Sequence, residues 1–337
     1  MRLLRLSMFA NFLVMTSALL GMAQQEPAPQ FRVSSRLVLV PVQVTDRAGK
    51  TIEGLTESDF ELYDAGVMRK FQLESENAPI SVVVAIQSST IAGPALAKIQ
   101  KIGSLLQPLV AGERGRVAVL TYSDRITLRQ DFTADPVTIG KAFRALLPDG
   151  QGSSMHDAVI EAVRMLSEQA ERRRKVLILI GEGKDRSSKA RLEAAVSKAQ
   201  EANVTVYPAS FSTYLTAFTS RGDERFASGA RVYNAAPGSL LEIFREIAHA
   251  GAENGHEALA RYTGGMRVSF VKLKGLETVV QKIGEDLHSQ YLLSFQSLSG
   301  QSVEDHKSYR DLRIRVRGMG AGTQVRHRPG YWQTPTE

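Results

Sequence analysis

The chain has no cysteine among its 337 residues, which excludes disulfide bonds, thiolate catalysis and cysteine-ligated zinc or iron–sulfur sites. Its six histidines lack the spacing typical of metal ligands, and no His-Glu-x-x-His sequence occurs. A Walker sequence and a Gly-x-Ser-x-Gly elbow are also absent. The sequence therefore lacks common signatures of metalloenzymes, nucleotide-binding proteins and serine hydrolases.

A strong excess of one charge is missing as well. The formal net charge is +7, and two of these charges belong to Arg2 and Arg5 near the N-terminus. Nucleic-acid-binding proteins carry a stripe of Lys and Arg or a recognisable module, and this sequence shows neither. The densest basic run, residues 171–175, precedes an apolar segment and is interpreted as a solvated helix end. We expect no nucleic-acid partner.

Long apolar runs are confined to the first 23 residues. Arg2 and Arg5 give a positive start, residues 6–20 are mostly apolar, and Gly21-Met22-Ala23 brackets a cut site with small residues. This layout predicts a secretory signal peptide and hence a secreted or periplasmic protein. An uncleaved N-terminal anchor remains the alternative. No later segment is predicted to span a bilayer, so the mature chain is expected to have no membrane span.

From Ile80 onward, apolar runs alternate with amphipathic stretches. The runs are short and rich in Val, Leu and Ile, as expected of parallel strands covered on both faces. Strands are predicted at residues 80–86, 116–122, 175–180, 204–211 and 266–271. Helices are predicted, from apolar residues at helical spacing, at residues 91–110, 136–147, 155–171, 188–202, 239–260 and 276–287. Repeated β–α steps predict an α/β fold with a doubly wound, mostly parallel, Rossmann-like sheet.

The segments on either side show the alternation of antiparallel strands with one wet face. These strands are predicted at residues 37–44, 60–64, 67–73, 290–296, 311–317 and 324–328. We expect them to pack together as a β-sandwich-like module into which the α/β domain is inserted. The predicted organisation is a signal peptide (1–23), a linker (24–36), the first part of the β module (37–76), the α/β domain (77–288), the second part of the β module (289–332) and a tail (333–337). Within the α/β domain, residues 212–236 are polar and are interpreted as an insertion loop.

Three segments of the α/β region resemble a known family. Residues 81–90 are similar to the first strand and loop of von Willebrand factor type A (VWA) domains, which carry Asp-x-Ser-x-Ser/Thr there. Residues 152–158 resemble the family's Gly-Thr-x-Leu-x-Asp-Ala helix start, and residues 177–183 its apolar strand ending in Thr-Asp-Gly. The flanks, residues 54–64 and 289–295, resemble VWA-related proteins abundant in acidobacteria.

The resemblance implies a metal-ion-dependent adhesion site at the carboxyl ends of the strands, where open α/β sheets place their ligands. Hydroxyls and carboxylates from three loops hold Mg²⁺ in the family, and a partner carboxylate fills the open position. Carried over to this chain, the ligands are Ser88, Thr90, Ser153 and Glu182. The family's first Asp falls on Ile86, which cannot bind a cation. A hard cation requires carboxylates to offset its charge, so we expect a degenerate site with at most weak Mg²⁺ binding.

The sequence accordingly predicts an exported, non-catalytic VWA module that binds a protein partner of unknown identity. Its partner-binding residues are predicted to lie in the strand-end loops and to be Gln87, Ser88, Ser89, Ser153, Ser154 and Glu182. The first alternative is an Mg²⁺-dependent adhesion module in which Glu182 is helped by Asp149 or Asp185. The second is a hydrolase that uses the cluster of Ser153, His156 and Asp157, although neighbours at a helix start have diverging side chains.

Overall fold

A computed structural model describes residues 35–74, 78–170, 173–211, 247, 255–270, 275–298, 308–320 and 322–333. The predicted signal peptide and the predicted 212–236 insertion lie outside these residues. Among the residues that the structure does describe, no helix has the length and apolar character needed to cross a membrane.

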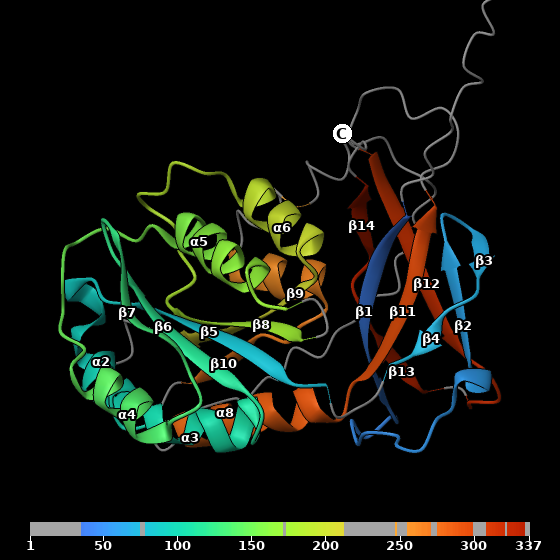
Figure 1. Cartoon of the computed structure of the whole chain (residues 1–337), viewed down its shortest axis with the longest axis horizontal. Helices are drawn as coiled ribbons and strands as arrows, with labels where there is room; N and C mark the ends of the chain where they lie inside the picture. The colour runs from blue at the N-terminus through green and yellow to red at the C-terminus, as the bar shows by residue number, and fades with distance from the viewer. Residues whose placement is uncertain are drawn as a thin grey trace, which may run out of the picture. The chain divides into compact units, whose positions relative to one another are not determined.

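A six-stranded sheet forms the centre of the α/β part (Figure 1). In order across the sheet, its strands are β10 (Val268–Phe270), β9 (Val204–Phe211), β8 (Arg174–Gly181), β5 (Ile80–Gln87), β6 (Arg116–Tyr122) and β7 (Ile126–Thr133). Neighbouring strands from β10 to β6 are parallel, and β7 runs antiparallel to β6 at the edge. The doubly wound, mostly parallel sheet is therefore confirmed, while β7 was not predicted from the sequence.

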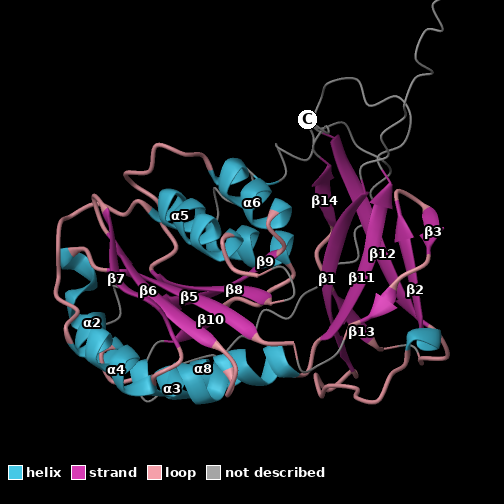
Figure 2. Ribbon diagram, viewed as in Figure 1, coloured by secondary structure: helices cyan, strands magenta, loops and turns pink. Residues whose placement is uncertain are grey.

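Helices cover both faces of this sheet because alternate side chains of each buried strand point to opposite sides (Figure 2). Val82, Val84 and Ile86 pack on one side and Val83 and Ala85 on the other. The first face is covered by α2 (Gly93–Ile99), α3 (Gly103–Leu106), α4 (Pro136–Arg144) and α8 (Gly275–His288). The second is covered by α5 (Met155–Ser167), α6 (Leu192–Glu201) and the helical residues 255–263.

The single helix predicted over residues 91–110 is wrong. The segment is divided into a 3₁₀ turn (Thr90–Ala92), α2, α3 and a π-helical turn (Gln107–Ala111). Pro108 lacks the N–H that a continuous α-helix needs, which accounts for the change of winding there. Gly103 lies against Phe143, and a Cβ at this position would be 2.6 Å from that side chain. Close packing on α4 thus requires a glycine in the middle of the predicted helix.

The flanking segments form two four-stranded sheets, here called the β module. One has the strand order β13 (Gln324–Arg326), β1 (Ser35–Thr45), β11 (Tyr291–Leu298) and β4 (Gln72–Leu73). The other has the order β14 (Gly330–Gln333), β12 (Ser308–Val316), β2 (Phe60–Asp64) and β3 (Val67–Arg69). Both combine strands from the two ends of the chain, as the alternation predicted. The strand predicted over residues 67–73 is divided between the two sheets, and β14 was not predicted.

A buried ion cluster lies within the apolar core of the β module. The Asp64 side chain is only 1% exposed, and its carboxylate accepts hydrogen bonds from Arg310 at 2.7 and 2.9 Å and from Arg69 at 3.3 Å. The Tyr331 hydroxyl donates to the same carboxylate at 3.3 Å. The hydrogen bond to Asp64 raises the pKa of Arg310 above its ordinary value, so this arginine stays charged.

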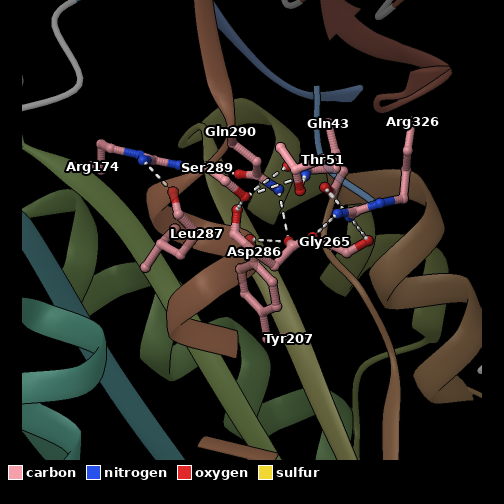
Figure 3. Close-up of polar contacts among 11 residues, drawn as sticks. Gln43, Thr51, Arg174, Tyr207, Gly265, Asp286, Leu287, Ser289, Gln290 and Arg326 are labelled. Atoms are coloured by element: carbon pink, nitrogen blue, oxygen red, sulfur yellow. Dashed lines mark hydrogen bonds and ion pairs between the residues drawn. The ribbon is translucent and has the colours of Figure 1, made fainter. Parts of the chain in front are cut away.

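A second polar cluster joins the β module to the α/β part (Figure 3). Asp286, near the end of α8, accepts hydrogen bonds from Tyr207 at 2.9 Å and from Gln290 at 3.0 Å, and it forms an ion pair with Arg326 of β13. Arg326 also donates to the carbonyl oxygens of Gly264 and Gly265, at 2.9 and 2.5 Å. These bonds connect α8, β9 and the turn before β10 to a strand of the β module.

Arg174 contradicts the prediction of a solvated basic run. It is the first residue of β8, is 8% exposed, and donates to the Leu287 carbonyl at 2.7 Å and to Gln290 Oε1 at 3.1 Å. Burial lowers the pKa of its guanidinium. The neighbouring Arg173 donates to Ser81 Oγ at 2.7 Å and to the Ile80 carbonyl at 2.8 Å. Both arginines therefore donate hydrogen bonds to protein acceptors near the amino end of β8 and are not simply solvated.

The Asp64 cluster should contribute strongly to stability. Replacing Asp64→Asn leaves two arginines beside a neutral amide, so the free energy of unfolding should fall by about 3 kcal/mol. The matched control is Glu61→Gln on the same strand, which removes a more exposed ion pair with Arg317 and should change stability little. Urea unfolding measures both variants, and equal losses would contradict the assignment.

The Asp286 cluster generates a second prediction. Asp286→Asn removes the charge that faces Arg326 and should lower the free energy of unfolding by about 2 kcal/mol. Glu285→Gln, at the adjacent exposed position of α8, is the control and should be nearly neutral. If chemical unfolding finds Asp286→Asn as stable as Glu285→Gln, the cluster does not hold the β module to the α/β part.

Candidate functional site

The carboxyl ends of β5, β6 and β8 meet at one edge of the sheet. Their registers pair Gln87 with Tyr122 and Ile86 with Ile180, so the three strands end at the same level. Residues 88–92 and 182–191 follow β5 and β8 directly, and residues 149–154, between α4 and α5, are hydrogen-bonded to both; we call these three segments the strand-end loops. Backbone bonds join two of them, from Thr90 N to the Gly150 carbonyl at 2.9 Å and from Asp149 N to the Ser88 carbonyl at 2.6 Å.

The structure places Gln87, rather than Ile86, among the polar groups at the end of β5. Ile86 is fully buried in the same apolar cluster as Val82 and Val84, on the side of β5 opposite to Val83 and Ala85. Gln87, the last residue of β5, occupies the strand end instead. Its amide nitrogen donates to Ser89 Oγ at 2.9 Å and to Glu182 Oε1 at 3.0 Å, and its amide oxygen accepts from Glu182 N at 2.9 Å. The neutral residue that faces the site is therefore Gln87, not Ile86.

This shift of one residue changes which hydroxyls face the site. Ser89 contacts Gln87, whereas the Ser88 hydroxyl donates to the Tyr122 carbonyl at 3.4 Å within the sheet. The family's second hydroxyl would fall on Ile91, which has none and is 46% exposed. The assignment of Ser88 and Thr90 as ligands therefore stays a prediction, and in this structure the Ser88 hydroxyl is bonded within the sheet.

In the second loop, Ser153 uses its polar groups to bind the third loop. The Ser153 hydroxyl donates to the Lys184 carbonyl at 2.8 Å, and its N–H donates to Ser187 Oγ at 2.7 Å. The Ser153 carbonyl accepts from Arg186 N at 2.9 Å. Ser153 lies beside the loop of Glu182, as predicted, but its hydroxyl is committed to a backbone acceptor.

Glu182, the first residue after β8, has a compensating charge from its own loop. Arg186 forms an ion pair with the Glu182 carboxylate, which also accepts the hydrogen bond from Gln87. Burial opposes ionisation of Glu182, but the hydrogen bonds from Arg186 and Gln87 outweigh it and lower the pKa of this carboxyl group. Arg186 was not predicted as a site residue, although a cation four residues after a strand-end carboxylate is a sequence signal for such a pair.

The third loop also differs from the family at Gly181, which stands where the family has Thr. A Cβ at Gly181 would lie 2.2 Å from the Tyr122 hydroxyl and 3.0 Å from Gln87 Oε1. Tyr122 is fully buried and donates to the Ile180 carbonyl at 3.3 Å. Burial raises the pKa of Tyr122, and the nearby charge of Glu182 adds to this. A tyrosine and a glutamine thus fill the space at the floor of the site.

These residues do not fit a divalent cation. Mg²⁺ prefers several oxygen ligands with one or two carboxylates, and here the only carboxylate among Gln87, Ser89, Ser153 and Glu182 is bonded to a guanidinium. Of the acids expected to compensate, Asp149 pairs with Arg125 at 3.2 Å. Asp185 accepts from Ser188 Oγ at 2.6 Å and from His156 N at 3.2 Å. Within the described part of the chain, no group of three or more His, Asp or Glu could hold a metal ion.

The Ser153, His156 and Asp157 cluster does not form a triad. Ser153 donates to the Lys184 carbonyl, and His156 Nδ1 lies 3.2 Å from the Ala190 carbonyl. The Asp157 carboxylate accepts from the backbone N–H groups of Lys189 and Ala190, both at 2.9 Å. Each side chain fastens the loop before α6 instead of contacting the other two, so the arrangement gives no support to a hydrolase.

Most of the predicted partner-binding residues are inaccessible. Gln87, Ser88, Ser89, Ser153 and Ser154 are each 4% exposed or less. Their side chains form hydrogen bonds within the strand-end loops and expose little surface in this structure, so their role in partner binding stays a prediction. The exposed side chains of the same loops are Thr90, Ile91, Gln151, Lys184, Arg186, Ser187, Lys189 and Arg191.

Comparison with known proteins finds the family model of the von Willebrand factor type A domain over residues 87–234. No curated protein matches the chain. Similar solved structures include the conserved hypothetical protein BatB from Bacteroides thetaiotaomicron, at 15% identity and a TM-score of 0.42, covering 61% of this chain and 99% of that one. The vWF domain of the type V pili tip protein Mfa5 from Porphyromonas gingivalis has 13% identity and a TM-score of 0.41, with coverages of 62% and 94%.

A third similar structure is proximal thread matrix protein 1 from the mussel byssus, described with a zinc-occupied MIDAS motif. It has 13% identity and a TM-score of 0.43, and the match covers 65% of this chain and 48% of that one. The chain therefore matches the von Willebrand factor type A domain over residues 87–234.

Proposed function

We propose that this protein is an exported, non-catalytic VWA module that binds a protein partner through its strand-end loops without a divalent cation. Interaction with another protein is the general role that a VWA domain supports. Export is proposed from the signal-peptide pattern of residues 1–23. Independence from a metal ion is supported by the contacts of the strand-end residues.

The observation that carries the proposal is the state of Glu182. Its side chain is 6% exposed and is already neutralised by Arg186, which leaves no net negative charge to attract a cation. Gln87, which donates to Glu182, supplies an N–H where a cation would need a lone pair. A metal ion would have to displace Arg186 and turn the Gln87 amide, and both changes break hydrogen bonds to a buried carboxylate.

A metal titration tests this proposal. Mg²⁺, Mn²⁺ and Ca²⁺ up to millimolar concentrations should leave the melting temperature unchanged, and EDTA should have no effect, because a ligand that does not bind cannot stabilise the native state. Differential scanning fluorimetry is the measurement. Stabilisation that saturates with cation concentration would instead support the Mg²⁺-dependent adhesion module.

A gain of metal binding tests whether the family's first Asp corresponds to Gln87. The variant Gln87→Asp/Ile91→Ser/Arg186→Ala supplies a second carboxylate and a second hydroxyl and removes the guanidinium. Its melting temperature should rise with Mn²⁺ or Mg²⁺, by about 2–4 °C for each kcal/mol of binding free energy.

The matched control is Ile86→Asp/Ile91→Ser/Arg186→Ala, which places the new carboxylate at the position first assigned from the sequence. It should be strongly destabilised because it buries a charge in the apolar core, and it should not respond to cations. A folded Gln87→Asp/Ile91→Ser/Arg186→Ala variant with a flat cation response would refute the placement of the missing carboxylate at Gln87.

A further inference from the structure

The loop between β8 and α6 carries an excess of positive charge. Residues 182–191 contain four basic side chains, Lys184, Arg186, Lys189 and Arg191, and two acidic ones, Glu182 and Asp185. All four basic side chains are exposed, whereas both acids are partly buried. Asp185 is engaged by Ser188 Oγ and by the N–H groups of His156 and Ser188. The accessible charge of this loop is therefore positive.

Arg186 is the cation that lies at the centre of this loop. Its guanidinium covers the Glu182 carboxylate, and its side chain is 41% exposed whereas that of Glu182 is 6% exposed. The backbone on which it sits is held by bonds from Arg186 N to the Ser153 carbonyl at 2.9 Å and from Ser153 Oγ to the Lys184 carbonyl at 2.8 Å. The arginine is thus positioned by two loops and faces both the buried carboxylate and solvent.

A guanidinium in this position has the chemistry to bind a second carboxylate. It stays charged under physiological conditions and carries five N–H donors in a planar fork suited to carboxylates. Anchoring by Glu182 restricts its rotamers, which lowers the entropic cost of the next hydrogen bond. The charges of Lys184 and Lys189 in the same loop add a long-range attraction for acidic ligands.

We propose that Arg186 serves as a built-in cation and that the strand-end loops recognise an acidic segment of the protein partner through it. This inference rests on the proposed function, since it names the chemistry of the partner for the same site. In this proposal the Arg186 guanidinium, rather than a bound metal ion, binds the carboxylate group of the partner. The partner is therefore expected to present Asp or Glu side chains, and binding is expected to weaken as salt rises.

The experiment uses the purified chain and a labelled decapeptide of alternating Glu and Gly, with a Gln–Gly decapeptide as the uncharged control. Fluorescence anisotropy in the presence of EDTA should show saturable binding of the Glu peptide and none of the Gln peptide. Arg186→Gln should weaken binding about tenfold, as expected from the loss of one charge-assisted hydrogen bond.

The matched variant is Arg116→Gln, an exposed arginine at the amino end of β6, which makes the same change of charge at the opposite edge of the sheet. It should alter the affinity less than twofold, and circular dichroism should show that both variants fold. Equal losses in the two variants, absence of Glu-peptide binding, or equally tight binding of single-stranded DNA would each overturn the inference. If the metal titration stays flat in those cases, the proposed function stands and only the acidic partner is rejected; a metal-dependent response would reject both.

Discussion

A buried carboxylate at the end of a central strand is the constraint around which the strand-end loops are arranged. Glu182 follows directly after β8, where burial opposes its ionisation, and a buried charge must be paired or hydrogen-bonded. Two partners meet this requirement, Gln87 from β5 and Arg186 from the same loop. Ser153 then fastens the backbone on which Arg186 sits. The three loops thereby become one hydrogen-bonded unit.

The same requirement operates at the opposite end of the α/β part and in the β module. Arg174 enters the amino end of β8 and is stabilised by acceptors at the end of α8. Asp286, also near that end, receives Arg326 from a strand of the β module. Asp64 is enclosed by Arg69 and Arg310 within the β module. In each case a buried charge has its partner on a different strand or helix. Moving one element away from the other would leave that charge unpaired, which is costly, so the charge helps to fix their relative position.

Much of the fold could be predicted from the sequence because burial leaves a clear pattern. Strands covered on both faces are short runs of Val, Leu and Ile, and the predicted runs over 80–86, 116–122 and 204–211 agree closely with β5, β6 and β9. The edge strand β7 escaped prediction because most of its side chains are partly or fully exposed and leave no apolar run. The helix over 91–110 was wrong because Gly103 and Pro108 outweigh apolar spacing locally.

The sequence by itself determined that polar residues follow three buried strands and that one carboxylate of the family's site is missing. Only the tertiary structure decided which of two neighbouring side chains faces the strand-end loops, since Ile86 and Gln87 leave β5 on opposite sides. The pairing of Asp286 with Arg326, 40 residues apart in the sequence, could not be read from the chain either. An ion pair depends on distance in space, and composition and periodicity report burial but not which charges meet.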